Sequence, residues 1–198
     1  MKLPNSTYTA RAWALADIAP DFRVEDVWML PAGGSPDEFP ELVRQIAAGE
    51  GAFEGERFAV LIYVARQKLG AWFGWDRPEH GLGTRAISLR ERLPQDAGYE
   101  RGPDQRGAPW TSVYCTDREW VTEYASRTVH ALMLVGWVPE GGVHRGEMTV
   151  LVRPNGVLGR LYMAGIRPFR RLVVNPAFFR MVERNWDKSR ADRRPGVQ

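Results

Sequence analysis

The chain has 198 residues, of which 44% are hydrophobic and 11% aromatic, so it can build one packed domain and is not a disordered protein. The net charge is only +3 and the basic residues are almost all arginine, which we interpret as a solvated surface rather than a nucleic-acid-binding face. A single cysteine, Cys115, excludes an internal disulfide. The first ten residues lack the apolar run of a signal peptide, and no stretch is apolar enough for a membrane span, which predicts a cytoplasmic protein.

The N-terminal part of the chain predicts an arm and then one strand. Residues 1–21 carry no regular pattern, so we expect an N-terminal arm without packed structure. Residues 22–30 alternate well enough for a first strand, and the Pro- and Gly-rich residues 31–36 predict a turn.

Two helices are expected next. Apolar residues at helical spacing predict a helix over residues 37–48, with Ser35 or Asp37 capping its start, and a second helix over 57–73 that Gly74 ends.

The following segment, residues 75–109, is rich in Gly, Pro, Asp and Arg, and only 87–93 has the pattern of an ordered turn or two of helix. Such a long connection is either a lid over a pocket or an irregular surface loop, and the sequence leaves both open. Asp76, Glu79 and His80 lie in this segment, but no second histidine or cysteine stands at a ligand-like spacing, so we predict no metal site.

The second half of the chain predicts an antiparallel sheet covered by a terminal helix. Four strands are expected over residues 110–115, 118–125, 128–138 and 145–153. A long amphipathic segment over 156–186 follows, which Pro168 and Pro176 should kink or split. The terminal helix should cover the sheet with the apolar residues Leu161, Tyr162, Ile166, Phe169, Leu172 and Val173 rather than lie on a membrane. We therefore expect one domain over 22–187 and a flexible basic tail over 188–198.

Short turns between the strands predict which residues face each other. We expect Ala125 opposite Thr128 and Val138 opposite Arg145, which divides the strand residues into two sets. The set expected to face the helix is Val113, Cys115, Trp120, Thr122, Tyr124, Val129, Ala131, Met133, Val135, Trp137, Met148, Val150 and Val152. The set expected to face outward includes Ser112, Glu119, Glu123, Thr128, His130, Glu147, Thr149 and Arg153.

Two groups of residues are candidates for a functional site. Five residues of the helix-facing set could line a cavity for a small hydrophobic or aromatic ligand, namely Trp120, Thr122, Tyr124, Met133 and Met148, although plain core packing explains them equally well. His130 and Glu123 should face each other across a hairpin, where they form an ordinary charge pair on the outward face. If the register slips by one residue, the same pair points into the cavity and becomes the acid–base candidate; Tyr124, in the helix-facing set, is the alternative group for proton transfer.

Several sequence segments, taken together, resemble the bacterial domain-of-unknown-function family DUF2867 over residues 10–187. They are Ser-Leu-Arg-Glu-Arg-Leu-Pro at 88–94, Thr-Val-His-Ala at 128–131, Gly-Trp-Val at 136–138, Val-Arg-Pro-Asn-Gly at 152–156, Tyr-Met-Ala at 162–164 and Pro-Phe-Arg at 168–170. Members of that family look like relatives of the START and Bet v 1 (SRPBCC) helix-grip superfamily, which includes aromatase/cyclase and lipid-transfer proteins, and some are fused to an NAD(P)-binding oxidoreductase domain. The resemblance implies an α+β helix-grip fold with a curved antiparallel sheet packed on a long C-terminal helix, and two helices between the first and second strands. It implies no catalytic residue.

Three functions follow as hypotheses. The first is binding of a small hydrophobic or aromatic molecule between the sheet and the C-terminal helix. The second is a polyketide-cyclase-like or hydrolase-like enzyme that uses His130, Glu123 or Tyr124 for proton transfer. The third is a non-catalytic partner of a separate NAD(P)-dependent reductase, which only the fusions in similar proteins suggest. We predict no cofactor of its own, no nucleic-acid partner and no membrane association.

Overall fold

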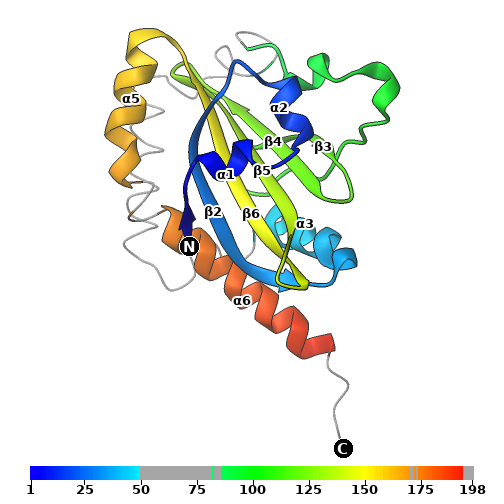
Figure 1. The fold of residues 1–198 in the computed structure, drawn as a ribbon. Helices are drawn as coiled ribbons and strands as arrows, with labels where there is room; N and C mark the ends of the chain where they lie inside the picture. The colour runs from blue at the N-terminus through cyan, green and yellow to red at the C-terminus, as the bar shows by residue number, and fades with distance from the viewer. Residues whose placement is uncertain (50–81, 83–85, 170–171, 173, 194–198) are drawn as a thin grey trace, which may run out of the picture.

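The protein is an α+β fold built on one curved, six-stranded antiparallel sheet (Figure 1). The computed structural model describes residues 1–49, 82, 86–169, 172 and 174–193. The strands are β1 (Lys2–Leu3), β2 (Arg23–Gly34), β3 (Thr111–Cys115), β4 (Glu119–Ala125), β5 (Val129–Glu140) and β6 (Val143–Pro154), in the spatial order β1-β2-β6-β5-β4-β3. The α-helices are α1 (Ser6–Thr9), α2 (Ala14–Ile18), α3 (Phe39–Ala48), α5 (Gly156–Phe169) and α6 (Asn175–Arg193). Short 3₁₀ turns are η1 (Pro36–Glu38), η3 (Leu89–Arg92) and η4 (Gln95–Ala97).

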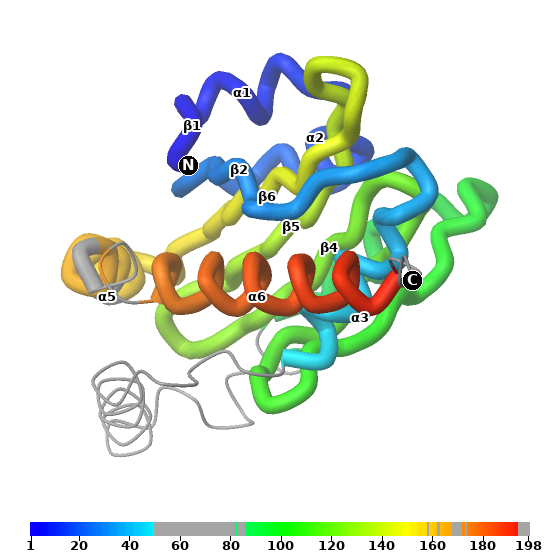
Figure 2. Tube along the Cα trace, turned by 90° about the horizontal axis from the view of Figure 1, so that it is seen from below, coloured from blue at the N-terminus to red at the C-terminus, as the bar shows by residue number. Residues whose placement is uncertain are grey.

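The C-terminal helix α6 crosses one face of the sheet beside α3, as Figure 2 shows. Met181, Val182 and Trp186 of α6 are buried in one apolar cluster with residues of α3 and of the predicted helix-facing set. The full cluster is Leu30, Ala32, Phe39, Leu42, Val43, Ile46, Ala47, Trp120, Met133, Val135, Trp137, Met148, Met181, Val182 and Trp186. The prediction that the apolar strand face lies under a C-terminal helix is thus confirmed.

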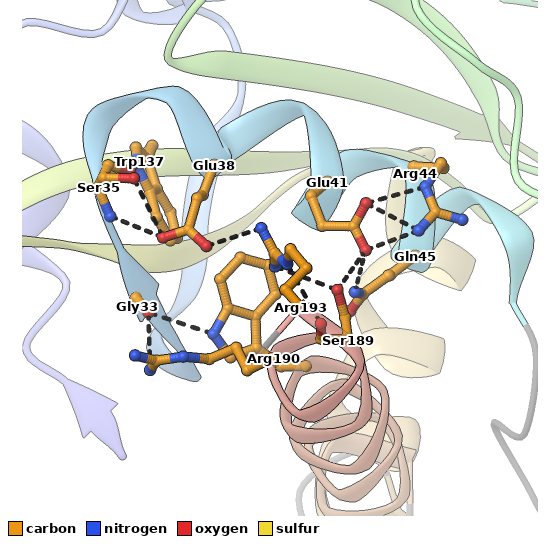
Figure 3. A network of polar contacts seen from close by, with 11 residues as sticks. Gly33, Ser35, Glu38, Glu41, Arg44, Gln45, Trp137, Ser189, Arg190 and Arg193 are labelled. Carbon is orange, nitrogen blue, oxygen red and sulfur yellow. Dashed lines mark hydrogen bonds and ion pairs between the residues drawn. The ribbon is translucent and has the colours of Figure 1, made fainter. Parts of the chain in front are cut away.

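Polar contacts fix the C-terminal end of α6 against η1 and α3 (Figure 3). The Trp186 indole donates to the Gly33 carbonyl at 3.2 Å, and the Ser189 hydroxyl donates to Glu41 at 2.9 Å. Arg193 lies 2.9 Å from a carboxylate oxygen of Glu38. Residues 188–193, expected as part of a flexible tail, are therefore the last turns of a docked helix.

The opposite face of the sheet is also buried, which the sequence analysis did not predict. Residues 1–21 are not an irregular arm: β1 pairs with β2, while Tyr8, Trp13 and Leu15 pack on the sheet with at most 6% of their surface exposed. Leu89 of η3 joins the same cluster. Among the residues that the structure describes, the buried apolar members of this cluster are Tyr8, Trp13, Leu15, Ala19, Phe22, Val27, Leu89, Val113, Tyr114, Val121, Leu132, Leu134, Val138 and Leu151. The sheet thus has two covered faces.

The N-terminal half contains α3 close to where it was expected. The 3₁₀ turn η1, which leads directly into α3, starts with a capping box in which Ser35 and Glu38 bond each other's backbone, and Gly49 ends α3 in the left-handed conformation with φ of 65°. The expected turn over 31–36 is wrong for its first residues, because β2 continues to Gly34. The second expected helix, over 57–73, lies outside the described residues.

Pairing between β5 and β6 has the predicted register, with Val138 opposite Arg145 and Met133 opposite Val150. Between β4 and β5 the prediction is off by two residues, because Ala125 faces His130 rather than Thr128. The assignment of β4 and β5 residues to the two faces survives, since a shift of two keeps every side chain on its side. Ser112 of β3, expected to face outward, is opposite Thr122 and accepts a hydrogen bond from the Trp120 indole, so its predicted orientation is wrong. In β3 an irregularity between Ser112 and Tyr114 places Val113 in the cluster on the second face, so its predicted orientation is wrong.

The expected terminal helix is split, as its two prolines predicted, into α5 and α6. Leu161 and Leu172, expected to cover the sheet, are instead 66% and 77% exposed, because α6 rather than α5 takes the main apolar face. Ile166 and the buried Met163 of α5 pack on Val129, Ala131 and Val152 at one end of the sheet. In the part of the chain that the structure describes, no helix combines the length and hydropathy needed to cross a bilayer.

Candidate functional site

The five residues predicted to line a ligand cavity all lie on the α6 face of the sheet, but most of them are packed. Trp120, Met133 and Met148 belong to the cluster under α3 and α6 and are at most 6% exposed. Tyr124 is half-buried and lies 5.9 Å from Trp110, measured between ring centroids. Thr122 is fully buried, and its hydroxyl has no hydrogen-bond partner among the described residues.

A pocket of about 520 Å³ opens beside this cluster, along one face of α3. We call it the α3 pocket. Its described lining residues are Phe39, Pro40, Val43, Arg44, Ala47, Ala48, Pro103, Asp104, Arg106, Cys115 and Thr116. Phe39, Val43 and Ala47 belong to the buried cluster and Cys115 packs against it, so the pocket extends the apolar layer that the sequence analysis identified.

Backbone contacts hold the walls of the α3 pocket in place. The Arg106 amide donates to the Ala47 carbonyl at 2.8 Å, which ties the loop to α3. Asp104 accepts a hydrogen bond from the Ser112 amide at 2.7 Å, which ties the same loop to β3. Gly102 allows this close approach, because a Cβ there would stand only 2.7 Å from the Cβ of Cys115. A pocket with walls fixed in this way is preformed rather than dependent on a ligand.

Cys115 is half-buried at the inner side of the α3 pocket. Burial raises the pKa of its thiol, and its sulfur lies 3.6 Å from the Thr116 carbonyl. A raised thiol pKa lowers the fraction of reactive thiolate at neutral pH.

His130 and Glu123 lie on the other face, where they are 1% exposed and joined by a hydrogen bond of 2.9 Å between Nε2 and Oε2. The expected pairing of these residues on a solvated outer face is therefore wrong. They do not face each other directly, since Glu123 is opposite Leu132 and His130 opposite Ala125, and they meet on the diagonal. Tyr124 is on the α6 face, so the structure does not bring the three acid–base candidates together.

The Glu123 carboxylate has its hydrogen-bonding positions occupied by protein groups. Ser88 Oγ donates to Oε1 at 2.5 Å, and the Leu89 amide donates to Oε2 at 3.0 Å. Burial raises the pKa of this carboxyl, but hydrogen bonds from His130, the Leu89 amide and Ser88 outweigh burial, so its pKa is lowered. The ionised carboxylate thus holds the start of η3 on the sheet.

The other nitrogen of His130 extends this contact into a longer network. Arg153 lies 3.5 Å from Nδ1, and because arginine only donates, Nδ1 accepts and Nε2–H donates to Glu123. Arg153 and Arg92 both bind Asp21, at 2.5 Å each. The network joins β4, β5, β6, η3 and residue 21, and its contacts are those of a structural clamp rather than of a free general base.

Two further carboxylates on this face, Glu119 and Glu147, were expected to face outward but are buried. Glu119 accepts from the Tyr114 hydroxyl at 2.9 Å and from the Ala14 amide at 3.1 Å. Burial raises the pKa of Glu147, while Arg11, at 3.3 Å, opposes that rise. Both glutamates stand opposite Gly136 on the neighbouring strands, so a glycine in a strand between two acidic residues was the signal that could have located them.

A second pocket, of about 560 Å³, lies where the β5–β6 hairpin, the β3–β4 turn, residues 11–13 and η1 meet. We call it the hairpin pocket. Its lining residues include Arg11, Trp13, Arg118, Trp137 and His144. None of these five was a candidate site residue in the sequence analysis. His130 and Glu123 line neither pocket. Within the described ranges, no three His, Cys, Asp or Glu side chains gather as metal ligands would, and the acidic residues at 76–80 lie outside them.

Comparison with known proteins gives one match. No curated protein and no solved structure is similar to the chain at a significant level. The model of a family described as protein of unknown function, DUF2867, matches residues 18–177, which is most of the chain and includes every strand of the sheet except β1. The chain therefore belongs to the DUF2867 family.

Proposed function

We propose that this protein binds a small hydrophobic or aromatic molecule in the α3 pocket. The observation that carries the proposal is the composition of the described lining: the buried side chains of Phe39, Val43 and Ala47 form an apolar floor, and a few polar residues lie beside them. Its volume of about 520 Å³ is that of a site for a small organic ligand.

The edge of the α3 pocket offers few but well-placed polar groups. Arg44 is fixed by Glu41 through contacts of 2.6 to 3.0 Å, and Asp104 is fixed by Arg101 and the Ser112 amide. Groups held in this way can orient a ligand by one or two hydrogen bonds while the floor supplies the binding energy. The ligand class is the one the sequence suggested, but the proposed site lies along α3 rather than over Trp120, Met133 and Met148. The likeness to helix-grip proteins remains part of this proposal.

Catalysis and partnership with a reductase stay predictions without a supporting contact among the described residues. His130 and Glu123 are occupied by the clamp and line neither pocket, so they offer a bound molecule no free base.

The test combines native mass spectrometry with a cavity-filling variant. Ala48→Phe places a ring at the half-buried wall of the α3 pocket, and Ala164→Phe makes the same change at an exposed position of α5. We expect an apolar molecule to co-purify with the wild type and with Ala164→Phe, and to be depleted from Ala48→Phe.

Cys115 supplies a second readout because it is the only cysteine and lines the pocket. Anilinonaphthalene sulfonate, used as an apolar probe, should slow the alkylation of Cys115 by iodoacetamide in the wild type and much less in Ala48→Phe. Equal binding by all three proteins, or alkylation that the probe leaves unchanged, would refute the assignment of the ligand to this pocket.

A further inference from the structure

The hairpin pocket has a different chemistry from the α3 pocket. Four segments that are distant in the sequence form it, and they bring together two arginines, two tryptophans and one histidine. Trp13 and Trp137 are at most 5% exposed and build its inner wall. A cavity formed by separate segments, with cations at an aromatic wall, has the make-up of a recognition site.

Each arginine of the hairpin pocket is positioned by a contact to a protein group, and its guanidinium group keeps further N–H donors for a ligand. Arg11 Nη2 contacts Glu147 at 3.3 Å, and Arg118 Nη2 donates to the Ala12 carbonyl at 3.2 Å. A guanidinium group carries five N–H donors, so these contacts position each group without using it up. The side chains are 32% and 59% exposed, which leaves their remaining donors open to a ligand.

At this end of the sheet, buried donors without a partner outnumber buried acceptors without a partner among the described residues. The Trp13 indole Nε1 and the Arg11 Nε are buried, and neither has a hydrogen-bond partner in the described part of the chain. Rotation of Arg11 toward the unpartnered Oε1 of Glu147 would satisfy one of them, but Trp13 would still need an acceptor. A bound oxyanion supplies acceptor oxygens to such a site.

Two features of the hairpin pocket restrict the class of ligand further. Asp37 and Asp117 also line the hairpin pocket, and hydrogen bonding from Ser35 lowers the pKa of Asp37, so a multiply charged anion would meet repulsion. His144 stacks on Trp137 with ring centroids 6.4 Å apart and an angle of 20° between the planes, which presents a flat surface to a ring.

From these contacts we propose that the hairpin pocket binds a small aromatic monocarboxylate. Its carboxylate contacts Arg118 and Arg11, and its ring lies against the His144–Trp137 stack. This site is separate from the α3 pocket and does not depend on the function proposed for that pocket.

The test is a titration followed by proton–nitrogen NMR of the indole groups, with the Trp13 signal assigned from Trp13→Phe. The probes are benzoate, its neutral analogue benzamide, and inorganic phosphate. Benzoate should shift the indole signals of Trp13 and Trp137 saturably, and benzamide and phosphate should bind about tenfold or more weakly, since each lacks one of the two recognised features.

Variants assign the effect to the pocket. Arg118→Gln leaves the buried Arg11–Glu147 pair intact and should weaken benzoate binding about tenfold, as expected for loss of a charge-assisted hydrogen bond. Arg160→Gln, at an exposed position of α5, is the matched control and should bind like the wild type. Absence of any benzoate-dependent shift, equal binding of benzamide or phosphate, or an unaltered affinity in Arg118→Gln would each overturn the proposal.

Discussion

The docking of the N-terminal segment on the sheet can be tested at one contact, between Gly136 and Trp13. Gly136 lies in β5 between Glu119 and Glu147 on the neighbouring strands, and the Trp13 ring rests on its bare Cα. A Cβ at this position would stand 2.8 Å from Trp13 Cζ3 and closer still to Cη2. Because Trp13 is only 5% exposed, its ring has little room to move away.

Gly136→Ala should therefore lower the free energy of unfolding by about 2 kcal/mol, the usual cost of forcing extra volume into a packed site. Trp13→Ala alone should cost roughly 3 to 5 kcal/mol, because it deletes a buried aromatic side chain. With the ring gone, Gly136→Ala meets no obstacle and should be neutral or stabilising by roughly 0.5 kcal/mol, since glycine is disfavoured inside a strand.

The assay is urea unfolding followed by far-ultraviolet circular dichroism, which does not depend on tryptophan fluorescence. The four proteins form a double-mutant cycle with an expected coupling of about 2 to 3 kcal/mol between the two positions. Gly165→Ala, which meets nothing within 4 Å on α5, is the control and should be additive with Trp13→Ala. Additivity of Gly136→Ala and Trp13→Ala would show that residues 11–13 are not packed on β5.

Three other predictions concern the buried polar groups. Glu123→Gln should destabilise the protein by roughly 2 to 3 kcal/mol in urea unfolding, because charge-assisted hydrogen bonds to a buried carboxylate are lost; a change below about 0.5 kcal/mol would contradict the clamp. The pKa of Glu123 is lowered, and that of Asp21 is lowered to about 2, chiefly by its hydrogen bond from Arg92. The stabilisation that these two ionised carboxylates give should thus be complete above the unfolded carboxyl pKa values of about 4 and should fall as the pH drops toward 2. The free energy of unfolding should therefore decline less steeply with falling pH in Glu123→Gln than in the wild type. Equal slopes in the two proteins would contradict this. Thr122→Val should leave stability within about 1 kcal/mol of the wild type or raise it, because the buried hydroxyl has no hydrogen-bond partner among the described residues; a larger loss in thermal unfolding would indicate a hydrogen bond at Thr122.

The strands of the second half could be predicted because their alternation is strong. β3 to β6 lie within a few residues of the expected ranges, and the apolar set lies under α6 as expected. The β4–β5 register was missed because the connection is longer than a two-residue turn. Ser126 bridges it, with its backbone amide bonding the Val129 carbonyl and its hydroxyl lying 3.2 Å from that of Thr128.

The N-terminal cover could not be predicted from periodicity. α1 and α2 have four and five residues, too few for a 3.6-residue pattern to repeat. The bulge that turns Val113 to the second face likewise leaves no mark in the sequence, since Ser112, Val113 and Tyr114 all suit a strand. Neither pocket was foreseen, because each is built by segments that meet only in the folded protein.

The second face of the sheet shows how acidic residues in a strand sequence can be interpreted. Glu119, Glu123 and Glu147 suggested a solvated face, yet Val121, Leu132, Leu134 and Leu151 share that face and are fully buried. A strand face that mixes long aliphatic side chains with a few carboxylates can belong to a second packed layer. Burial of an ionised carboxylate is costly unless a specific donor meets it.

In this protein each of the three carboxylates receives at least one hydrogen bond from a segment that packs on the sheet. Arg11 meets Glu147, the Ala14 amide meets Glu119, and Ser88 with the Leu89 amide meets Glu123. A shift of the N-terminal segment along the sheet would move Trp13 off Gly136, and it would also leave Glu119 and Glu147 buried without these partners. We infer that the polar pairs fix where the N-terminal segment docks, and that they thereby also fix Arg11 and Trp13 at the wall of the hairpin pocket.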